Sequence, residues 1–357
     1  GLEFQVGVFV GLAGILVCSF LGGMRAVTWT QVAQYIILII AYMIPVVWLS
    51  VVHTGNPVPQ IAYGQVLQQV TQLENEFNNA DTAKGAAEAS ARAAFKAQQD
   101  SFEARIVALD EAVAAGNGAA FVEAQRVEAD SPADFPATPD ALKAQWKKSA
   151  DGAKAKTGPV SAHAEAFSGK GAEKKLLNDN PDATAAEIAA AQAEDQEASN
   201  IKRRNFIALV LCLMVGTASL PHILMRYYTT PSVRDARKSV FWSLLFIFLL
   251  YFTAPALAVL VKFEVYNNLI GSPFASLPAW VANWAAVDPT LMKIADLNKD
   301  GLVQLAEMTI GGDLIVLATP EIAGLPYVIS GMVAAGGLAA ALSTADGLLL
   351  TIANVMS

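Results

Sequence analysis

The sequence predicts an all-α polytopic membrane protein with a helical extramembrane insertion. Hydrophobic residues make up 54% of the 357 residues and charged residues 16%, and the two kinds occupy separate stretches of the chain. Five long apolar runs alternate with polar segments, and a run of about twenty residues is enough to cross ~30 Å of hydrocarbon. Each spanning run is expected to be helical, because lipid offers no partner to an open backbone.

The apolar runs define the expected membrane parts. They cover residues 6–21, 32–52, 206–225, 240–261 and 322–356. We therefore expect two transmembrane helices with a cytoplasmic link in residues 1–52, two more with a basic link in residues 201–262, and one in residues 322–357. Since the sequence starts without Met and stops inside an apolar run, we interpret it as an internal fragment of a longer protein.

A polar insertion, residues 53–200, is rich in Ala, Gln, Glu, Lys and Asp. Thr138 precedes Pro139, which is typical of a helix start, and Thr184 and Glu187 have capping-box spacing. Apolar residues at helical spacing also favour amphipathic helices. We expect an Ala-rich helical hairpin that contacts a partner; a poorly ordered solvated insertion is the alternative.

Basic residues near the helix ends indicate the orientation. Arg25 lies in the first link, and the link after the third run carries Arg226, Arg234, Arg237 and Lys238. Both links are therefore expected in the cytoplasm, and both polar insertions on the extracytoplasmic side of the inner membrane. The net charge of −8 comes without a basic stripe interleaved with aromatics, which argues against nucleic acid as a partner.

The second polar segment, residues 263–321, contains the pattern of a calcium-binding loop. Residues 296–307 place oxygen donors at loop positions one, three, five and twelve, and glycine at position six. The expected ligands are Asp296, Asn298, Asp300, the carbonyl of Leu302, and Glu307. We expect a short helix capped by Asp288 before this EF-hand-like loop, and a structural role for Ca²⁺. A plain acidic loop is the alternative.

The fifth apolar run carries polar residues. Ser343 and Thr344 are adjacent residues with hydroxyl side chains, and Asp346 lies two positions after Thr344. A charge in the middle of a membrane helix costs at least about 2.5 kcal/mol, so Asp346 is a functional candidate. It is expected to tune a cation site, to accept a coupling proton, or to pair with a basic residue of another helix. The two hydroxyls alone are also explained by bonds to the helix carbonyls that precede them.

Three separated stretches resemble the sodium/solute symporter family. They are LGGMRAVTWTQVAQ at residues 21–34, LPHILMR at residues 220–226, and the Ala-x-x-Ser-Thr pattern of the fifth run. The segment GTASLPHILMRYYT, followed by ARKSVFW, is most similar to acetate permease-like, monocarboxylate-type members. The resemblance implies an inverted-repeat fold like that of the leucine transporter, present here in part, with substrate and sodium bound near the midplane.

The resemblance also implies residue roles. Sodium is expected at the carbonyl of Ala340 and the hydroxyls of Ser343 and Thr344, with Asp346 as a candidate coupling-ion residue. The expected substrate-lining residues are Gly216, Thr217 and Ser219. These lie just before a proline that removes a helix hydrogen bond, although small residues also serve close helix packing.

These features predict a transporter that catalyses no reaction. We expect a sodium-coupled symporter that imports a small organic solute, a short monocarboxylate such as acetate. The competing class is a solute sensor that uses a symporter-like membrane domain. The expected ions are Na⁺ as the coupling ion and Ca²⁺ as a structural ion. The expected partners are the solute, membrane lipid, and a small membrane or extracytoplasmic protein bound through residues 53–200.

Overall fold

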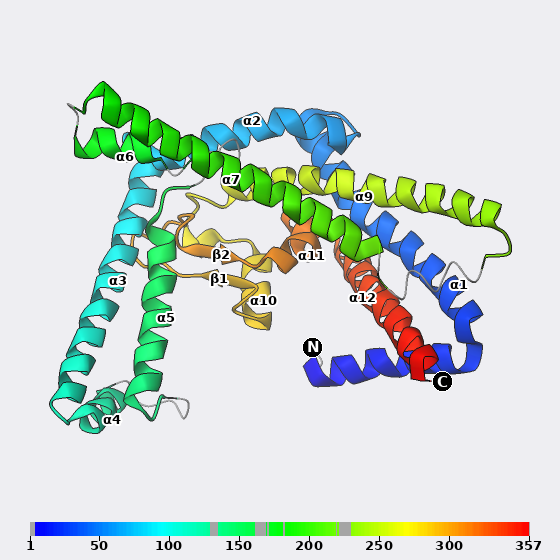
Figure 1. Cartoon of the computed structure of the whole chain (residues 1–357), viewed down its shortest axis with the longest axis horizontal. Coiled ribbons are helices and arrows are strands. Elements are labelled where there is room, and N and C mark those ends of the chain that lie inside the picture. The colour runs from blue at the N-terminus through cyan, green and yellow to red at the C-terminus, as the bar shows by residue number, and fades with distance from the viewer. Residues whose placement is uncertain are drawn as a thin grey trace. The chain divides into compact units, whose positions relative to one another are not determined.

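The computed structural model describes residues 4–128, 135–160, 169, 171–180, 183–218, 220 and 230–356, and its elements are nearly all helices (Figure 1). The helices are α1 (Phe4–Thr54), α2 (Pro59–Asn78), α3 (Ala83–Ala114), α4 (Gly118–Glu128), α5 (Pro139–Thr157), α6 (Ala172–Asp179), α7 (Ala185–Ala218), α9 (Val233–Asn268), the 3-10 helix η2 (Phe274–Ser276), α10 (Ala279–Val287), α11 (Gly312–Ile322) and α12 (Tyr327–Met356). Two short strands, β1 (Met292–Ile294) and β2 (Met308–Ile310), pair antiparallel. The predicted all-α class is confirmed.

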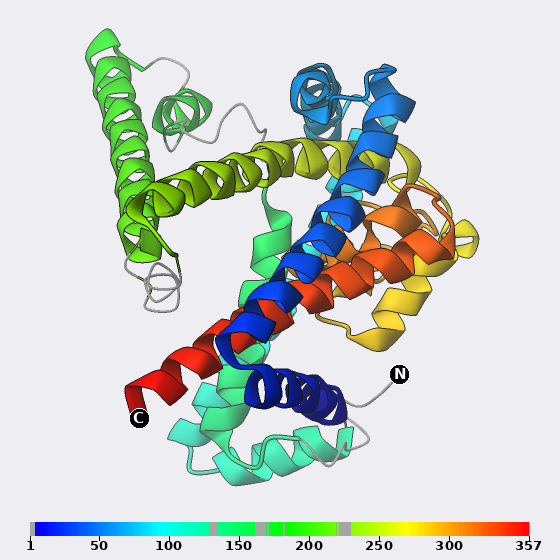
Figure 2. The same cartoon turned by 90° about the vertical axis from the view of Figure 1, so that its right-hand side faces the viewer.

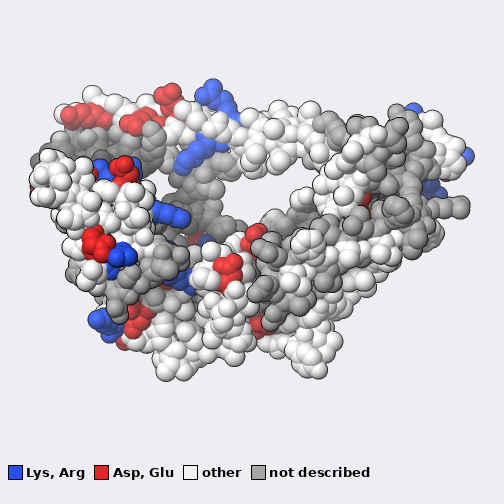
Figure 3. Space-filling view, turned by 90° about the horizontal axis from the view of Figure 1, so that it is seen from below, with Lys and Arg blue, Asp and Glu red and all other residues white. Residues whose placement is uncertain are grey.

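Three helical segments within the described part of the chain are long and apolar enough to cross a membrane. They are Thr28–Thr54 of α1, Val233–Asn268, which is α9, and Tyr327–Leu349 of α12. They overlap the second, fourth and fifth apolar runs of the sequence. On the face drawn in Figure 3, red and blue side chains are sparse among the white residues. The length and composition of these helices are those of an all-α polytopic membrane protein.

The N-terminal part of the fold differs from the predicted pair of helices. Helix α1 runs without interruption from Phe4 to Thr54, so the backbone around Arg25, predicted to be a link, is helical. Figures 1 and 2 show the ribbon turning sharply after its dark-blue beginning. A bent but continuous helix keeps the backbone hydrogen bonds within the segment, which is what a lipid environment requires.

Helix α7 begins well before the predicted third apolar run, because a capping box starts it in the polar segment. The backbone N–H of Thr184 donates to Glu187 Oε2 at 2.8 Å, and the N–H of Glu187 donates to Thr184 Oγ1 at 3.4 Å. These reciprocal bonds satisfy two donors of the first turn. The predicted helix start at Thr184 is confirmed, and the helix continues from there into the apolar run.

Helix α12 begins later than the predicted fifth run, because the chain turns just before it. Helix α11 contains Pro320 and ends at Ile322. Gly324 then adopts a left-handed φ of +66°, and the N–H of Leu325 donates to the carbonyl of Pro320 at 2.8 Å. This is the usual way in which a glycine ends a helix, so the first residues of the predicted run form the turn between α11 and α12.

By their contacts, the residues form two compact units. Unit 1 comprises Gly1–Thr71, Ser161–Val261 and Val316–Ser357, and unit 2 comprises Gln72–Val160 and Lys262–Ile315. Unit 2 therefore combines parts of two polar segments, 53–200 and 263–321, that the sequence suggested as separate domains. Residues between them in the sequence belong to unit 1.

Unit 2 contains a helical hairpin in which α3 and α5 lie side by side, with α4 at its closed end (Figure 1). Its core is formed by Leu109, Val122, Leu142 and Trp146, all of them buried. Helix α5 starts as predicted, with Thr138 Oγ1 accepting from the N–H of Ala141 at 3.3 Å. The hairpin is thus held by an apolar core and begins its second long helix with a capped end.

The second part of unit 2 is attached to the hairpin through a buried carboxylate. Glu88 of α3 is 2% exposed, and it accepts hydrogen bonds from the N–H groups of Leu305 at 2.8 Å and Ala306 at 3.1 Å. Arg92, one turn along α3, pairs with the same carboxylate at 3.3 Å. From α5, Lys156 Nζ donates to the carbonyl of Met308 at 2.7 Å. Both hairpin helices therefore bind the backbone of the 296–308 segment.

Replacing Glu88 by Ala should destabilise unit 2. The change leaves the N–H groups of Leu305 and Ala306 without their acceptor, and an unsatisfied buried donor costs about 1–3 kcal/mol. Thermal unfolding of the purified protein and amide hydrogen exchange at residues 305 and 306 measure the effect. Glu111→Ala, an exposed position on the same helix, is the matched control. Equal melting temperatures and equal exchange in the two variants would contradict this role of Glu88.

Candidate functional site

Helices α1 and α12 pack against each other within unit 1, and they run side by side in Figures 1 and 2. At Gly336 of α12, an added Cβ would lie 3.0 Å from Ala41 Cβ and 3.5 Å from Leu38 Cα. The two helix backbones therefore approach closely because position 336 has no side chain, a packing mode common between membrane helices.

Near this contact, the three predicted sodium ligands form one cluster of oxygen atoms on α12. Ser343 Oγ donates to the carbonyl of Ala340 at 2.9 Å, and Thr344 Oγ1 donates to the same carbonyl at 3.2 Å. These bonds are the ones that hydroxyls make to their own helix in a membrane. They also gather a carbonyl and two hydroxyls, the kind of donors that hard cations take, at one point of the helix.

The cluster is tied to α1 by an amide side chain that the sequence reading missed. Gln31 Nε2 donates to the carbonyl of Ser343 at 2.9 Å, so a residue of α1 binds the backbone of α12 at the cluster. Gln31 and Gln34 lie three residues apart in the stretch WTQVAQ, which was noticed only for its resemblance. Two amides at this spacing on an apolar helix share a face, and that signal was present in the sequence.

A cavity of about 850 Å³ lies between α1, α9 and α12 in unit 1. Its lining includes all three predicted sodium ligands, and its polar wall is completed by Thr28, Gln31, Gln34 and Tyr35 of α1 and by Ser239 and Ser243 of α9. Two of these groups, Gln34 Oε1 and the Tyr35 hydroxyl, are buried without a hydrogen-bond partner. Buried polar groups usually have a partner, so the cavity presents hydrogen-bonding capacity to a small polar molecule.

Of the other residues expected in the transport site, Asp346 and Gly216 do not line this cavity. Asp346 is 3% exposed and lies on α12, but it is not among the described residues that line the cavity. Gly216 is exposed near the end of α7 and does not line the cavity either. The side chain of Thr217, and Ser219 as a whole, lie outside the described residues.

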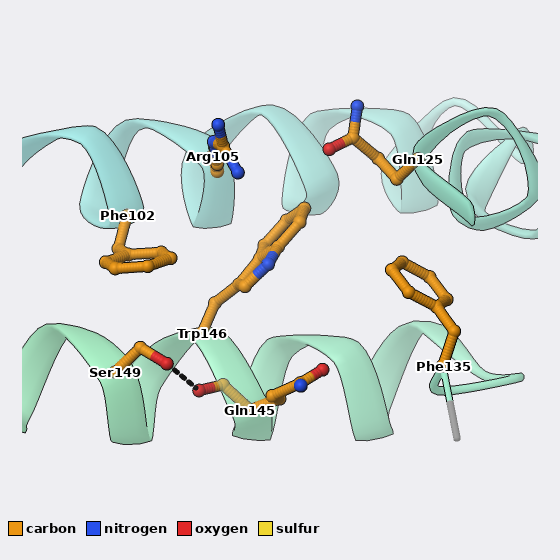
Figure 4. Close-up of a pocket in the computed structure, with 7 residues that line it drawn as sticks. All are labelled: Phe102, Arg105, Gln125, Phe135, Gln145, Trp146 and Ser149. Carbon is orange, nitrogen blue, oxygen red and sulfur yellow. Dashed lines mark hydrogen bonds between the residues drawn. The ribbon is translucent and has the colours of Figure 1, made fainter. Parts of the chain in front are cut away.

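A second cavity, of about 440 Å³, lies in the hairpin of unit 2. Figure 4 shows Trp146 of α5 pointing toward α3, with Phe102 on one side and Phe135 on the other. Arg105 lies on α3 above this group, 6.0 Å from the Phe102 ring centroid. Since Trp146 belongs to the apolar core of the hairpin, we interpret this cavity as a gap in the packing beside that core and propose no ligand for it.

The predicted calcium loop is flanked by strands, which corrects the expectation of a preceding helix. Helix α10 ends at Val287, and Asp288 is its C-terminal cap instead of the N-cap of another helix. Asp288 Oδ1 accepts from the N–H of Thr290 at 2.7 Å, which turns the chain into β1. Strand β1 pairs with β2, with Met292 opposite Ile310 and Ile294 opposite Met308, so the loop closes at its base.

Within the loop, the backbone follows the predicted pattern. Gly301, at position six, has a φ of +74°, a left-handed conformation that glycine adopts without strain. Glu307 Oε1 accepts from the N–H groups of Leu297 at 2.6 Å and Asn298 at 3.3 Å. Burial raises the pKa of Glu307, although these N–H groups act in the opposite direction. Within the described residues, no three Asp, Glu, His or Cys side chains already stand together as a metal site.

Comparisons with known proteins agree with the resemblance seen in the sequence. Residues 1–101 match the model of the family described as "Sodium:solute symporter family". The whole chain is 46% identical, over 370 aligned residues, to an uncharacterized symporter of Cupriavidus necator, and spans 50% of the length of that protein. A shorter stretch of 43 residues is 56% identical to a monocarboxylic acid transporter of Corynebacterium glutamicum, covering 12% of this chain and 8% of that protein.

No solved structure matches the chain, so the fold of the leucine transporter stays a prediction. The chain spans half the length of the Cupriavidus necator relative, so the activity of the whole protein is taken up below as a proposal. The residues that the sequence resemblance assigned to sodium, Ala340, Ser343 and Thr344, therefore lie at the cavity beside the contact of α1 and α12.

Substituting Gly336 by Val should weaken the contact between α1 and α12. The added side chain would meet Ala41 and the backbone of Leu38, and overpacking of this kind costs about 1–3 kcal/mol. The melting temperature of the detergent-purified protein measures the loss. Gly331→Val is the control, since an added Cβ at Gly331 meets nothing within 4 Å. If both variants melted together, the close contact at Gly336 would have no bearing on stability.

Proposed function

Starting from the confirmed relationship to the sodium:solute symporter family, we propose that the protein carrying this chain couples the movement of Na⁺ to the uptake of a small organic solute. The proposal rests on one observation above the others. The carbonyl of Ala340 and the hydroxyls of Ser343 and Thr344 cluster on α12, at the wall of a polar cavity that α1 and α9 complete. The resemblance of the Ala-x-x-Ser-Thr pattern and the geometry of the cluster thus support α12 as the ion-binding element.

The chemistry of the cluster suits sodium. Na⁺ is a hard cation that prefers neutral or charged oxygen ligands, and a transmembrane helix has few oxygens left once its carbonyls are used in backbone bonds. Each hydroxyl donates a hydrogen bond to the Ala340 carbonyl. The lone pairs of both hydroxyl oxygens therefore stay available to a cation.

Asp346 is proposed as a second coupling-ion residue. It follows Ser343 by three positions, so the two lie on neighbouring points of one helix face, and its side chain is 3% exposed. Ionisable residues inside membrane spans commonly mark ion pathways. We propose that it adjusts the affinity of the neighbouring cluster for the coupled cation.

For the solute, we propose a short monocarboxylate. Support comes from the 43-residue match to a protein named as a monocarboxylic acid transporter. Gly216, Thr217 and Ser219 remain our proposed substrate-lining residues, because amides freed near a helix break can bind a carboxylate. We further propose that both polar insertions lie on the extracytoplasmic side of the inner membrane. Support comes from the basic residues that follow the third apolar run, namely Arg226, Arg234, Arg237 and Lys238.

Uptake by vesicles containing the full-length protein tests the function directly. Labelled acetate, pyruvate, lactate and proline are offered with an inward sodium gradient, and again with potassium replacing sodium. We expect a monocarboxylate to accumulate several-fold faster with the sodium gradient, because the ion's downhill movement drives the solute. If no solute moved faster with sodium, the symporter proposal would fail, and proline as the favoured solute would overturn the substrate class alone.

Removing the hydroxyls should lower the affinity for sodium. For Ser343→Ala or Thr344→Ala, we expect the sodium concentration for half-maximal uptake to rise by about tenfold, which corresponds to ~1.4 kcal/mol of binding free energy. Thr351→Ala is the matched control. Its hydroxyl makes the same kind of bond, to the carbonyl of Gly347 at 2.8 Å, on the same helix but away from the cluster.

The comparison isolates ion binding from helix stability, because all three changes remove a hydroxyl bonded to a preceding carbonyl. A sodium dependence shifted equally in all three variants, or in none, would remove Ser343 and Thr344 from the proposed site.

A further inference from the structure

The loop of residues 296–307 contains buried oxygen atoms that nothing in unit 2 satisfies. Asp296 Oδ1, Gln304 Oε1 and Glu307 Oε2 each lack a hydrogen-bond partner, and Glu307 is only 4% exposed and Gln304 2% exposed. An unsatisfied buried acceptor is costly, and a buried carboxylate oxygen more so. Three of them within twelve residues call for an explanation.

The positions of these atoms suggest one. In a twelve-residue calcium loop, positions one, nine and twelve are ligand positions, and position twelve is a glutamate that offers both carboxylate oxygens. Asp296, Gln304 and Glu307 occupy positions one, nine and twelve of the segment. Glu307 Oε1 is held by the N–H groups of Leu297 and Asn298 at the start of the loop, so its carboxylate lies against the loop it would close.

We propose that residues 296–307 bind one calcium ion. The ligands are Asp296, Asn298, Asp300, the carbonyl of Leu302 and Glu307, with Gln304 at the ninth position directly or through water. The site is independent of the proposed transport activity, and the ion is structural.

Binding requires one local rearrangement. Asp300 Oδ2 accepts from Gln304 Nε2 at 2.6 Å and from Asn298 Nδ2 at 2.9 Å, so it is occupied by the side chains of two other proposed ligands. The cation replaces these bonds, and the amides of Asn298 and Gln304 turn their oxygens inward. Gly301 already has the left-handed backbone of position six, so the turn itself does not need to change.

The loop is also placed so that an ion would stabilise more than its own twelve residues. Its last turn donates the N–H groups of Leu305 and Ala306 to the buried Glu88 of α3. Strands β1 and β2 close its base. An ion that fixes the loop therefore fixes the attachment of the hairpin to the rest of unit 2.

The test is a titration of the detergent-purified protein, freed of metal by a chelator, with calcium chloride and separately with magnesium chloride. Isothermal titration calorimetry should detect one calcium ion per chain with a dissociation constant of about 10⁻⁴–10⁻³ M, the range of extracellular calcium modules. Calcium should raise the melting temperature by a few degrees, and slow amide exchange in residues 297–307. Magnesium should do so more weakly, because it demands a smaller octahedral site.

Variants separate the loop from other acidic residues. Asp296→Asn and Glu307→Gln should weaken calcium binding at least about tenfold, because each removes a charged ligand. Asp300→Asn, at an exposed position, should do the same without threatening the fold, whereas Asp313→Asn, an exposed acid outside the loop, should bind like the parent. Absence of binding by the parent up to about 5 mM calcium, or unchanged binding by all three loop variants, would overturn the proposal.

Discussion

Where α12 passes α1, Gly336 faces Ala41 at a distance that leaves no room for a side chain. This contact brings the backbone of α12 within reach of Gln31, whose amide binds the carbonyl of Ser343. The oxygen cluster of Ala340, Ser343 and Thr344 therefore lies at the wall of the cavity because the two helices touch. Lipid cannot drive such contact by the hydrophobic effect, so small residues and interhelical hydrogen bonds must hold it. The proposed ion site depends on that contact.

In unit 2 the governing constraint is the satisfaction of buried polar groups. Glu88 is buried in α3, yet it receives two backbone N–H groups and a charged partner, Arg92. Glu74, also fully buried, pairs with Lys262. These carboxylates join residues that lie 217 and 188 positions apart in the sequence. By contrast, Asp296 and Glu307 each have a buried carboxylate oxygen without a hydrogen-bond partner. A bound cation would provide these oxygens with a partner.

The sequence was sufficient for features that depend on local chemistry. The capping pairs at Thr138 and Thr184 begin helices as predicted, and the left-handed Gly301 falls at the position that the loop pattern requires. The apolar runs located three candidate spans because length and hydropathy are properties of one segment. The Ala-x-x-Ser-Thr pattern led to an oxygen cluster because residues three and four apart share a helix face.

Features that depend on distant residues could not be predicted in this way. The sequence has no local signal that Glu88 bonds to residues 305 and 306, so the two polar segments were assigned to separate domains. The continuity of α1 past Arg25 was missed because a basic residue and two glycines suggest a link as readily as a bent helix. Gln31 was overlooked because its role comes from a partner on α12.

The central claim is that the cluster at the contact of α1 and α12 binds the coupled cation. Equilibrium binding of radioactive sodium to the purified full-length protein tests it without depending on the choice of solute. The account predicts saturable binding that is displaced by unlabelled sodium but not by potassium, and that is weakened when both Ser343 and Thr344 are replaced by Ala. Saturable binding of equal affinity in the parent and in this double variant would contradict it.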